Sequence, residues 1–186
     1  LDEYPFSPPI ERDRPPRLVF TGKMDYRPNV DAVEWFVGEI FPLVRAARPD
    51  AEFHIVGQQP ERRVTALGAS PGVRVLGAVP DTRPHIAGAG VYVAPLRMGG
   101  GSRFKLLEAF ALGAPVVSTP LGAAGFPVAD ERELLLADGA AEFARAVLRV
   151  LADPLLAERL RRAGRAFVAD YDWSRIVPQL EAVYSI

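Results

Sequence analysis

The sequence predicts an α/β domain of doubly wound, Rossmann-like type, with a parallel sheet of about six strands and helices on both faces. Two observations predict this fold: short apolar runs that close at glycine or proline, and segments of helical periodicity that alternate with them. Strands that alternate with helices are joined by right-handed crossovers, which make the strands parallel and place helices over both faces of the sheet.

The linker, strands and helices follow one another along the chain. Residues 1–16 carry five prolines, which are incompatible with a regular strand ladder, so this segment is predicted to be a linker. Strands are predicted at 18–21, 52–56, 73–76, 91–94, 115–118 and 134–136. Helices are predicted at 33–47, 60–68, 81–88, 103–112, 140–152, 154–169 and 173–185.

Composition excludes several classes of function. The chain has 186 residues, of which 49% are apolar, and this is enough for one globular domain. Its net charge of -1 argues against nucleic-acid binding, which needs a basic patch. The absence of cysteine excludes disulfides and thiol chemistry, and only two histidines without metal-ligand spacing argue against a metal site. The chain begins at Leu1 rather than Met, so we expect it to be a piece of a longer protein.

Three loops are predicted at the edge of the sheet where the strands' carboxyl ends lie, here called the ligand edge. They comprise residues 22–29, 77–81 and 95–103, each directly after a predicted strand. In doubly wound folds, ligands bind beyond the carboxyl ends of the strands. The only two lysines of the chain, Lys23 and Lys105, fall in or beside these loops.

The stretch PLRMGGGSRFKLLEAF at 95–110 places cations where a helix begins. The helix N-terminus is already positive, so Arg103 and Lys105 should each destabilise it by roughly 0.3–1 kcal/mol. A bound phosphate would offset this, because glycines allow close backbone approach and N–H groups and cations then face the anion. Glu108 is three residues after Lys105 and could accept hydrogen bonds from sugar hydroxyls. The residues alone equally allow a flexible glycine turn followed by a surface Lys–Glu pair.

The run GGGSRFKLLEAFALGAPVVSTPLGAAGF resembles the sugar-donor signature in the C-terminal domain of GT-B fold glycosyltransferases of the retaining family 4, also called group 1. The bacterial branch associated with exopolysaccharide and cell-surface glycan synthesis is the most similar. TGKMDYRPNVDAVEWF resembles the first strand and helix of that domain, YDWSRIVPQLEAVY its closing helix, and LDEYPFSPP the end of the interdomain hinge. The resemblance implies a hinge at 1–16, a nucleotide-sugar domain at 17–172 and a helix at 173–186 that crosses toward an N-terminal domain.

The resemblance also implies roles for particular residues. Glu108 matches the second glutamate of the family's Glu-x7-Glu motif, which binds the ribose, whereas the first glutamate, which contacts the transferred sugar, is replaced by Gly100. Lys23 stands in place of the family's diphosphate-binding arginine, and the lysine that follows it in the family aligns with Asn29. The predicted sugar-donor site comprises Gly22, Lys23, Val79, Gly100, Gly101, Ser102, Arg103, Lys105 and Glu108, with Arg27, Asn29 and Gly122 as further candidates.

Several of these residues have structural alternatives. Asn29 and Asp31 are also predicted N-caps of the following helix, and Asp25 could either orient Lys23 or cap a turn. His54, inside a strand, is expected to be buried and hydrogen-bonded, whereas His85 is expected to be structural or solvated.

The implied activity is transfer of a sugar from a nucleoside-diphosphate sugar of UDP or GDP type, without a further cofactor. Lys23, Arg103, Lys105 and the helix N-terminus would stabilise the departing diphosphate without a metal. In the resembled family the acceptor site and the catalytic residues belong to the N-terminal domain, so this chain should bind the sugar donor and not transfer sugar alone. We expect a cytoplasmic location, or the inner face of the membrane reached only through that domain.

Two other classes share the fold. A sugar-nucleotide epimerase would grip phosphate similarly but needs further catalytic carboxylates and histidines. A receiver-type interaction module needs acidic residues after the first strands, where this chain has Thr21, Gly22 and Lys23.

Overall fold

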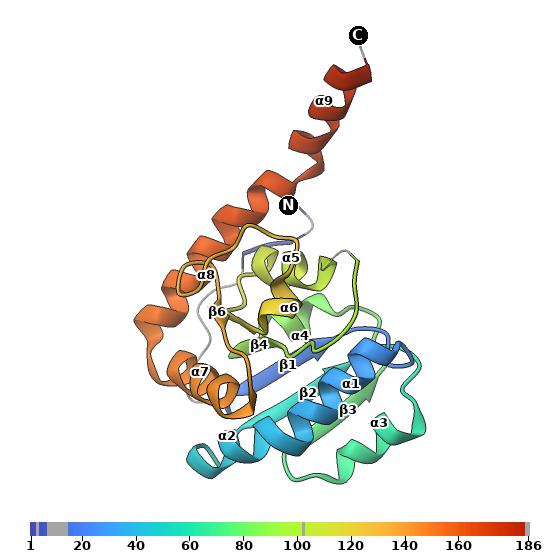
Figure 1. The fold of residues 1–186 in the computed structure, drawn as a ribbon, viewed down its shortest axis with the longest axis vertical. Coiled ribbons are helices and arrows are strands. Elements are labelled where there is room, and N and C mark those ends of the chain that lie inside the picture. Colours follow the sequence, from blue (N-terminus) through green and yellow to red (C-terminus); the bar gives the residue numbers. More distant parts are fainter. Residues whose placement is uncertain (3, 7–14, 102, 185–186) are drawn as a thin grey trace.

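The computed structural model describes residues 1–2, 4–6, 15–101 and 103–184, and it contains a six-stranded sheet with the order β3-β2-β1-β4-β5-β6 (Figure 1). All neighbouring strands are parallel, which confirms the predicted fold class. The strands are β1 (Arg17–Thr21), β2 (Glu52–Val56), β3 (Val73–Gly77), β4 (Val91–Ala94), β5 (Val116–Ser118) and β6 (Leu135–Leu136). Each predicted strand is present, with its ends shifted by no more than one residue.

Helices cover both faces of the sheet and divide the core into two clusters. One face carries α1 (Arg27–Trp35), α2 (Phe41–Ala47), α3 (Arg62–Ala66) and α7 (Ala140–Ala152). The other carries α4 (Arg83–Ala87), α5 (Phe104–Ala111), α6 (Pro120–Ala123) and α8 (Pro154–Val168). Along β1, Leu18 and Phe20 enter the first cluster and Val19 enters the second. Burial on both faces explains why these strands are continuous apolar runs rather than alternating ones.

The helical segment predicted at 33–47 begins earlier and is interrupted. Between α1 and α2 lies a π-helical turn, Phe36–Ile40, in which the Phe41 N–H bonds to the Phe36 carbonyl. Pro42 follows directly and has no N–H to donate to the preceding turn, so a wider turn at this point is compatible with its sequence. Trp35 and Phe36 are buried against Phe143 of α7, as expected for core residues.

The predicted helix caps near residue 29 are wrong. Helix α1 begins at Arg27, with Tyr26 at the N-cap position, and Asn29 and Asp31 lie inside the helix. Pro28 explains the earlier start, because its fixed φ and missing N–H suit the first helical turn. Asp31 instead forms a two-pronged ion pair with Arg97, at 2.7 and 3.1 Å.

A short helix that the sequence did not predict, α6, follows β5. The Thr119 hydroxyl accepts a hydrogen bond from the Gly122 N–H at 2.9 Å, and Pro120 starts the helix. Four residues are too few to show a helical period, so the cap was the only available signal.

Arginines from α8 hold the C-terminal end of α5. Arg161 donates from Nε to the Gly113 carbonyl at 2.6 Å, and Arg165 donates to the Ala111 carbonyl. Arg165 also donates to the Tyr4 carbonyl at 2.7 Å. Positive charge at a helix C-terminus is stabilising, so these contacts fix the helix whose other end faces the ligand edge.

The chain ends with the 3-10 turn Ala169–Tyr171 and α9 (Trp173–Tyr184), which extends away from the sheet (red in Figure 1). Trp173, at its start, is 72% exposed. None of the helices in the described ranges is long and apolar enough to cross a membrane.

The close packing of α8 on α5 predicts a stability difference between two glycines. A Cβ at Gly164 of α8 would lie 2.5 Å from the Phe110 ring, whereas a Cβ at Gly38 would meet nothing within 4 Å. Gly164→Ala should lower the free energy of unfolding by about 1–3 kcal/mol through overpacking, less any gain in helix propensity. Gly38→Ala, the matched control, should be neutral or stabilising by up to about 1 kcal/mol. Urea denaturation of both variants measures the difference; equal midpoints would contradict the packing described.

Candidate functional site

The candidate site lies at the ligand edge between β1 and β4, where the strand order reverses. β1 leads through α1 to β2 on one side, whereas β4 leads through α5 to β5 on the other. Such a switch point is where doubly wound sheets bind ligands. The loops after β1 and β4 are two of the three candidates from the sequence, and the structure places them together.

Lys105 joins the two loops. From the first turn of α5 its Nζ donates a hydrogen bond to Asn29 Oδ1 at 2.7 Å and lies 4.0 Å from the centre of the Phe20 ring. Asn29 in turn donates from Nδ2 to the Lys23 carbonyl at 2.9 Å. The ammonium group is therefore held over the end of β1 rather than extended into solvent.

Gly22 makes this arrangement possible. A Cβ at Gly22 would lie 2.6 Å from Asn29 Nδ2 and 3.1 Å from Lys105 Nζ. Because real Cβ atoms almost never approach so closely, any other residue at this position would displace the asparagine or the lysine. Gly22 is thus part of the site through the space it leaves.

Burial strongly perturbs the Lys105 ammonium. Burial, together with the nearby charge of Arg103, lowers the pKa of Lys105 to about 7, although the charge of Glu108 acts in the opposite direction. A lysine with this pKa changes charge near neutral pH, and an anion beside it would favour the charged form. Perturbed cations of this kind are concentrated at functional sites.

Glu108 lies one turn after Lys105 and is half-buried. Burial raises the pKa of its carboxyl group, and the charge of Lys105 partly offsets this. The two side chains form no ion pair, because Lys105 bonds to Asn29, and the Glu108 carboxylate has no hydrogen-bond partner among the residues that the structure describes. The alternative of an ordinary surface Lys–Glu pair is therefore wrong.

Arg103 occupies the N-cap position of α5, so the helix predicted at 103–112 begins one residue later, at Phe104. Its guanidinium donates to the carbonyls of Gly99, at 2.8 Å, and Leu121, at 3.1 Å, and the residue is 8% exposed. Its Nε is buried without a partner. Arg103 thus ties the glycine loop to α6 and places a fixed positive charge behind the first turn of α5.

The glycine loop itself is open. Gly99 and Gly101 have φ of +99° and +93°, which strongly favour glycine, whereas Gly100 has no such conformation. A Cβ at Gly100 or Gly101 would meet nothing within 4 Å. Ser102, between Gly101 and Arg103, lies outside the described residues.

The remaining candidates are arranged around this centre. Lys23 is exposed and pairs with Asp25 at 3.2 Å, which supports the orienting role for that aspartate. Arg27 is exposed at the start of α1, and Val79 packs at the ligand edge beside the second core cluster. Gly122 is buried in α6, where a Cβ would lie 2.4 Å from Ser118 Oγ, and its N–H is already bonded to Thr119.

Sequence reasoning missed how Asn29 and Phe20 hold the lysine. The sequence predicts Asn29 as a helix cap or as a ligand contact, whereas its role as the acceptor for Lys105 depends on a contact between residues 76 positions apart in the chain. The sequence predicts Phe20 only as a strand residue. No local pattern reports such a pairing.

Comparisons with known proteins identify the family of this chain. Residues 15–153 match the family described as glycosyl transferases group 1. The phosphatidyl-myo-inositol mannosyltransferase of Propionibacterium freudenreichii subsp. shermanii is 34% identical over 196 residues, covering 100% of this chain and 48% of that protein. The enzyme of the same name from Mycobacterium leprae is 34% identical, covering 78% and 41%. The chain thus spans about half the length of the curated relatives it matches.

Solved structures share the fold. Sucrose-phosphate synthase from Thermosynechococcus elongatus superposes with a TM-score of 0.74 at 27% identity, covering 95% of this chain and 46% of that one. Staphylococcus aureus TarM, in a complex that includes UDP, gives a TM-score of 0.78 at 16% identity, covering 98% and 38%. With the family match over most of its length, this chain belongs to the glycosyl transferases group 1 family of GT-B fold glycosyltransferases.

Proposed function

We propose that the chain is the half of a glycosyltransferase that binds the nucleotide sugar, and that the diphosphate binds at the N-terminus of α5. One observation carries the proposal: Lys105, beside the glycine loop, is held at the switch point by a hydrogen bond to Asn29 with its pKa lowered to about 7. Such an ammonium gains more from an anion than an exposed lysine does, because burial has already removed much of its water.

The diphosphate would be bound by three kinds of group. N–H groups at the start of α5, other than that of Leu106, which bonds to the Arg103 carbonyl, would provide directed hydrogen bonds, and Lys105 would provide a charge-assisted one. Arg103 adds positive potential from behind the loop, and Lys23 adds it from the rim. These groups would stabilise the negative charge that grows on the diphosphate as the sugar leaves.

Glu108 would bind the ribose. Its carboxylate has no protein hydrogen bond among the described residues and lies one turn further along the same helix as Lys105. Ribose hydroxyls are neutral donors, and a half-buried carboxylate is a strong acceptor for them. A cation and a carboxylate in this order suit a diphosphate followed by a sugar.

The nucleotide is proposed to be of UDP or GDP type. The TarM complex contains UDP, and one relative, from Corynebacterium glutamicum, is named a GDP-mannose-dependent mannosyltransferase. The names of the relatives favour a lipid-linked acceptor over the exopolysaccharide suggested by the resemblance. An N-terminal domain would supply the acceptor site and the catalytic residues, and with them a retaining outcome. Helix α9 would cross toward that domain. The whole protein would act in the cytoplasm or at the inner face of the membrane.

Nucleotide binding should depend on Lys105. The chain should bind UDP or GDP, and Lys105→Met should weaken binding about tenfold or more, because hydrogen bonds to charged groups contribute roughly 1.5–3 kcal/mol. Glu108→Gln should also lower the affinity for this nucleotide. Arg145→Met, a substitution at an exposed position on α7, should leave the affinity unchanged. Isothermal titration calorimetry measures the affinity of the native chain and of the three variants. Absence of binding to the native chain at millimolar nucleotide would refute the proposal.

The affinity should fall with rising pH above neutrality. Bound diphosphate raises the pKa of Lys105 above its free value of about 7, so binding takes up a proton. The stabilisation is complete below pH 7 and is lost as the pH rises through the pKa of the complex. Calorimetry at pH 7.5 in buffers of different ionisation enthalpy should show proton uptake in the native chain and none in Lys105→Met; equal uptake in both would contradict the assignment.

Restoring the family's first glutamate tests the placement of the sugar. Gly100→Glu should fold normally, because a Cβ at this position meets nothing within 4 Å. A carboxylate there should strengthen binding of UDP-glucose or GDP-mannose relative to the free nucleoside diphosphate, by about two- to tenfold for one or two hydrogen bonds. An unchanged ratio for both sugars would place the sugar elsewhere.

A further inference from the structure

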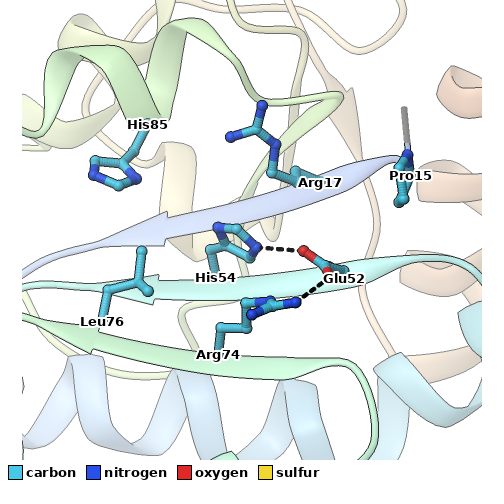
Figure 2. A pocket seen from close by; sticks show the side chains of 7 residues that line it. All are labelled: Pro15, Arg17, Glu52, His54, Arg74, Leu76 and His85. Carbon is cyan, nitrogen blue, oxygen red and sulfur yellow. Dashed lines mark hydrogen bonds and ion pairs between the residues drawn. The ribbon is translucent and has the colours of Figure 1, made fainter. Parts of the chain in front are cut away.

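A second concave region lies on the bare part of the sheet. The face that carries α4 and α5 is covered over β1, β4 and β5, but α4 has only five residues and leaves β2 and β3 open on this side. The result is a pocket of about 430 Å³ (Figure 2). Its lining residues are Pro15, Arg17, Glu52, His54, Arg74, Leu76 and His85.

The side chains of this pocket alternate with core residues along the strands. On β2, Glu52 and His54 face the pocket, whereas Phe53 and Ile55 enter the first core cluster. His54 is 8% exposed and bonded to Glu52, which confirms the buried, hydrogen-bonded role expected for it. Both histidines of the chain line this one pocket, His54 from β2 and His85 from α4 (Figure 2).

The carboxylate that lines the pocket is already paired, whereas one of its two arginines is not. Glu52 accepts from Arg74 at 2.8 Å and is paired with His54 Nε2 at 2.8 Å, so its carboxylate is fully engaged. Arg17, in contrast, has no side-chain hydrogen bond or ion pair with any residue that the structure describes, and a Cβ added at Gly88, after α4, would lie 3.4 Å from its guanidinium. The His85 ring is likewise without a hydrogen-bond partner in the described ranges, and it interacts electrostatically with Asp81, which is bonded to Arg83.

We propose that this pocket binds a small phosphate-bearing molecule, held by the Arg17 guanidinium together with the His85 ring. A guanidinium presents a planar fork that matches a phosphate, and the His85 imidazole can donate a further N–H, whereas His54 Nε2 is already paired with Glu52 and His54 only lines the pocket. Leu76 provides an apolar contact for the remainder of the ligand. Arg17 and Glu52 begin their strands, so the charged end of the pocket lies away from the ligand edge, whereas Leu76 lies one residue before the end of β3.

The two histidines provide a direct probe. Inorganic phosphate, titrated at constant pH and ionic strength against chloride, should shift the ring-proton NMR signals of both histidines to saturation. Arg17→Gln should weaken this binding about tenfold or more, because it removes the charged donor. His85→Gln should weaken it several-fold while His54 still reports, which guards against misfolding of the first variant.

Two controls separate this site from the sugar-donor site. Lys105→Met and Arg145→Met should both leave the histidine shifts and their midpoint unchanged. Shifts that do not saturate, that persist in Arg17→Gln, or that vanish in Lys105→Met would overturn the proposal.

Discussion

The hydrogen bond from Lys105 to Asn29 is the interaction on which the site depends. It connects the helix after β4 with the helix after β1, across the point where the strand order reverses. Without it the two loops would still share an edge of the sheet, but the ammonium would be free to extend into solvent. Phe20 beneath and Gly22 beside it leave room for this lysine and for no additional side chain.

The same interaction accounts for a cation at the N-terminus of α5, the end at which the helix dipole disfavours positive charge. Lys105 and Arg103 oppose the dipole of α5, and among the described residues neither forms an ion pair with a carboxylate: the charge of Glu108 only partly favours charged Lys105, and Arg103 bonds to carbonyls. At the other end, Arg161 and Arg165 favour the dipole and anchor the helix to α8. The helix is thus stabilised at its C-terminal end and left electropositive at its N-terminal end, as an anion site requires.

Much of this could be predicted from the sequence because it rests on local patterns. Apolar runs closed by glycine or proline predicted all six strands, the fold class predicted the ligand edge, and GGGSRFKLLEAF marked a candidate site on that edge. The π-helical turn at Phe36–Ile40 and the acceptor role of Asn29 could not be predicted, since they depend on packing around α7 and on a contact between distant segments. Arg103 shows the same limit: its residue type suggested a phosphate ligand, whereas its position also makes it a backbone brace between Gly99 and Leu121.

The pocket on β2 and β3 has a different physical origin from the ligand edge. It arises because α4 is too short to cover the sheet. The strands carry charged and imidazole side chains at alternate positions on this uncovered face. The ligand edge arises from topology, which would direct any chain of this fold to bind there.

A crystal structure of the chain with UDP or GDP tests the central claim most directly. The account predicts a diphosphate oxygen within hydrogen-bond distance of Lys105 Nζ and of backbone N–H groups in the first turn of α5, with a ribose hydroxyl on Glu108. A diphosphate bound elsewhere, with Lys105 bonded to Asn29 alone, would contradict it.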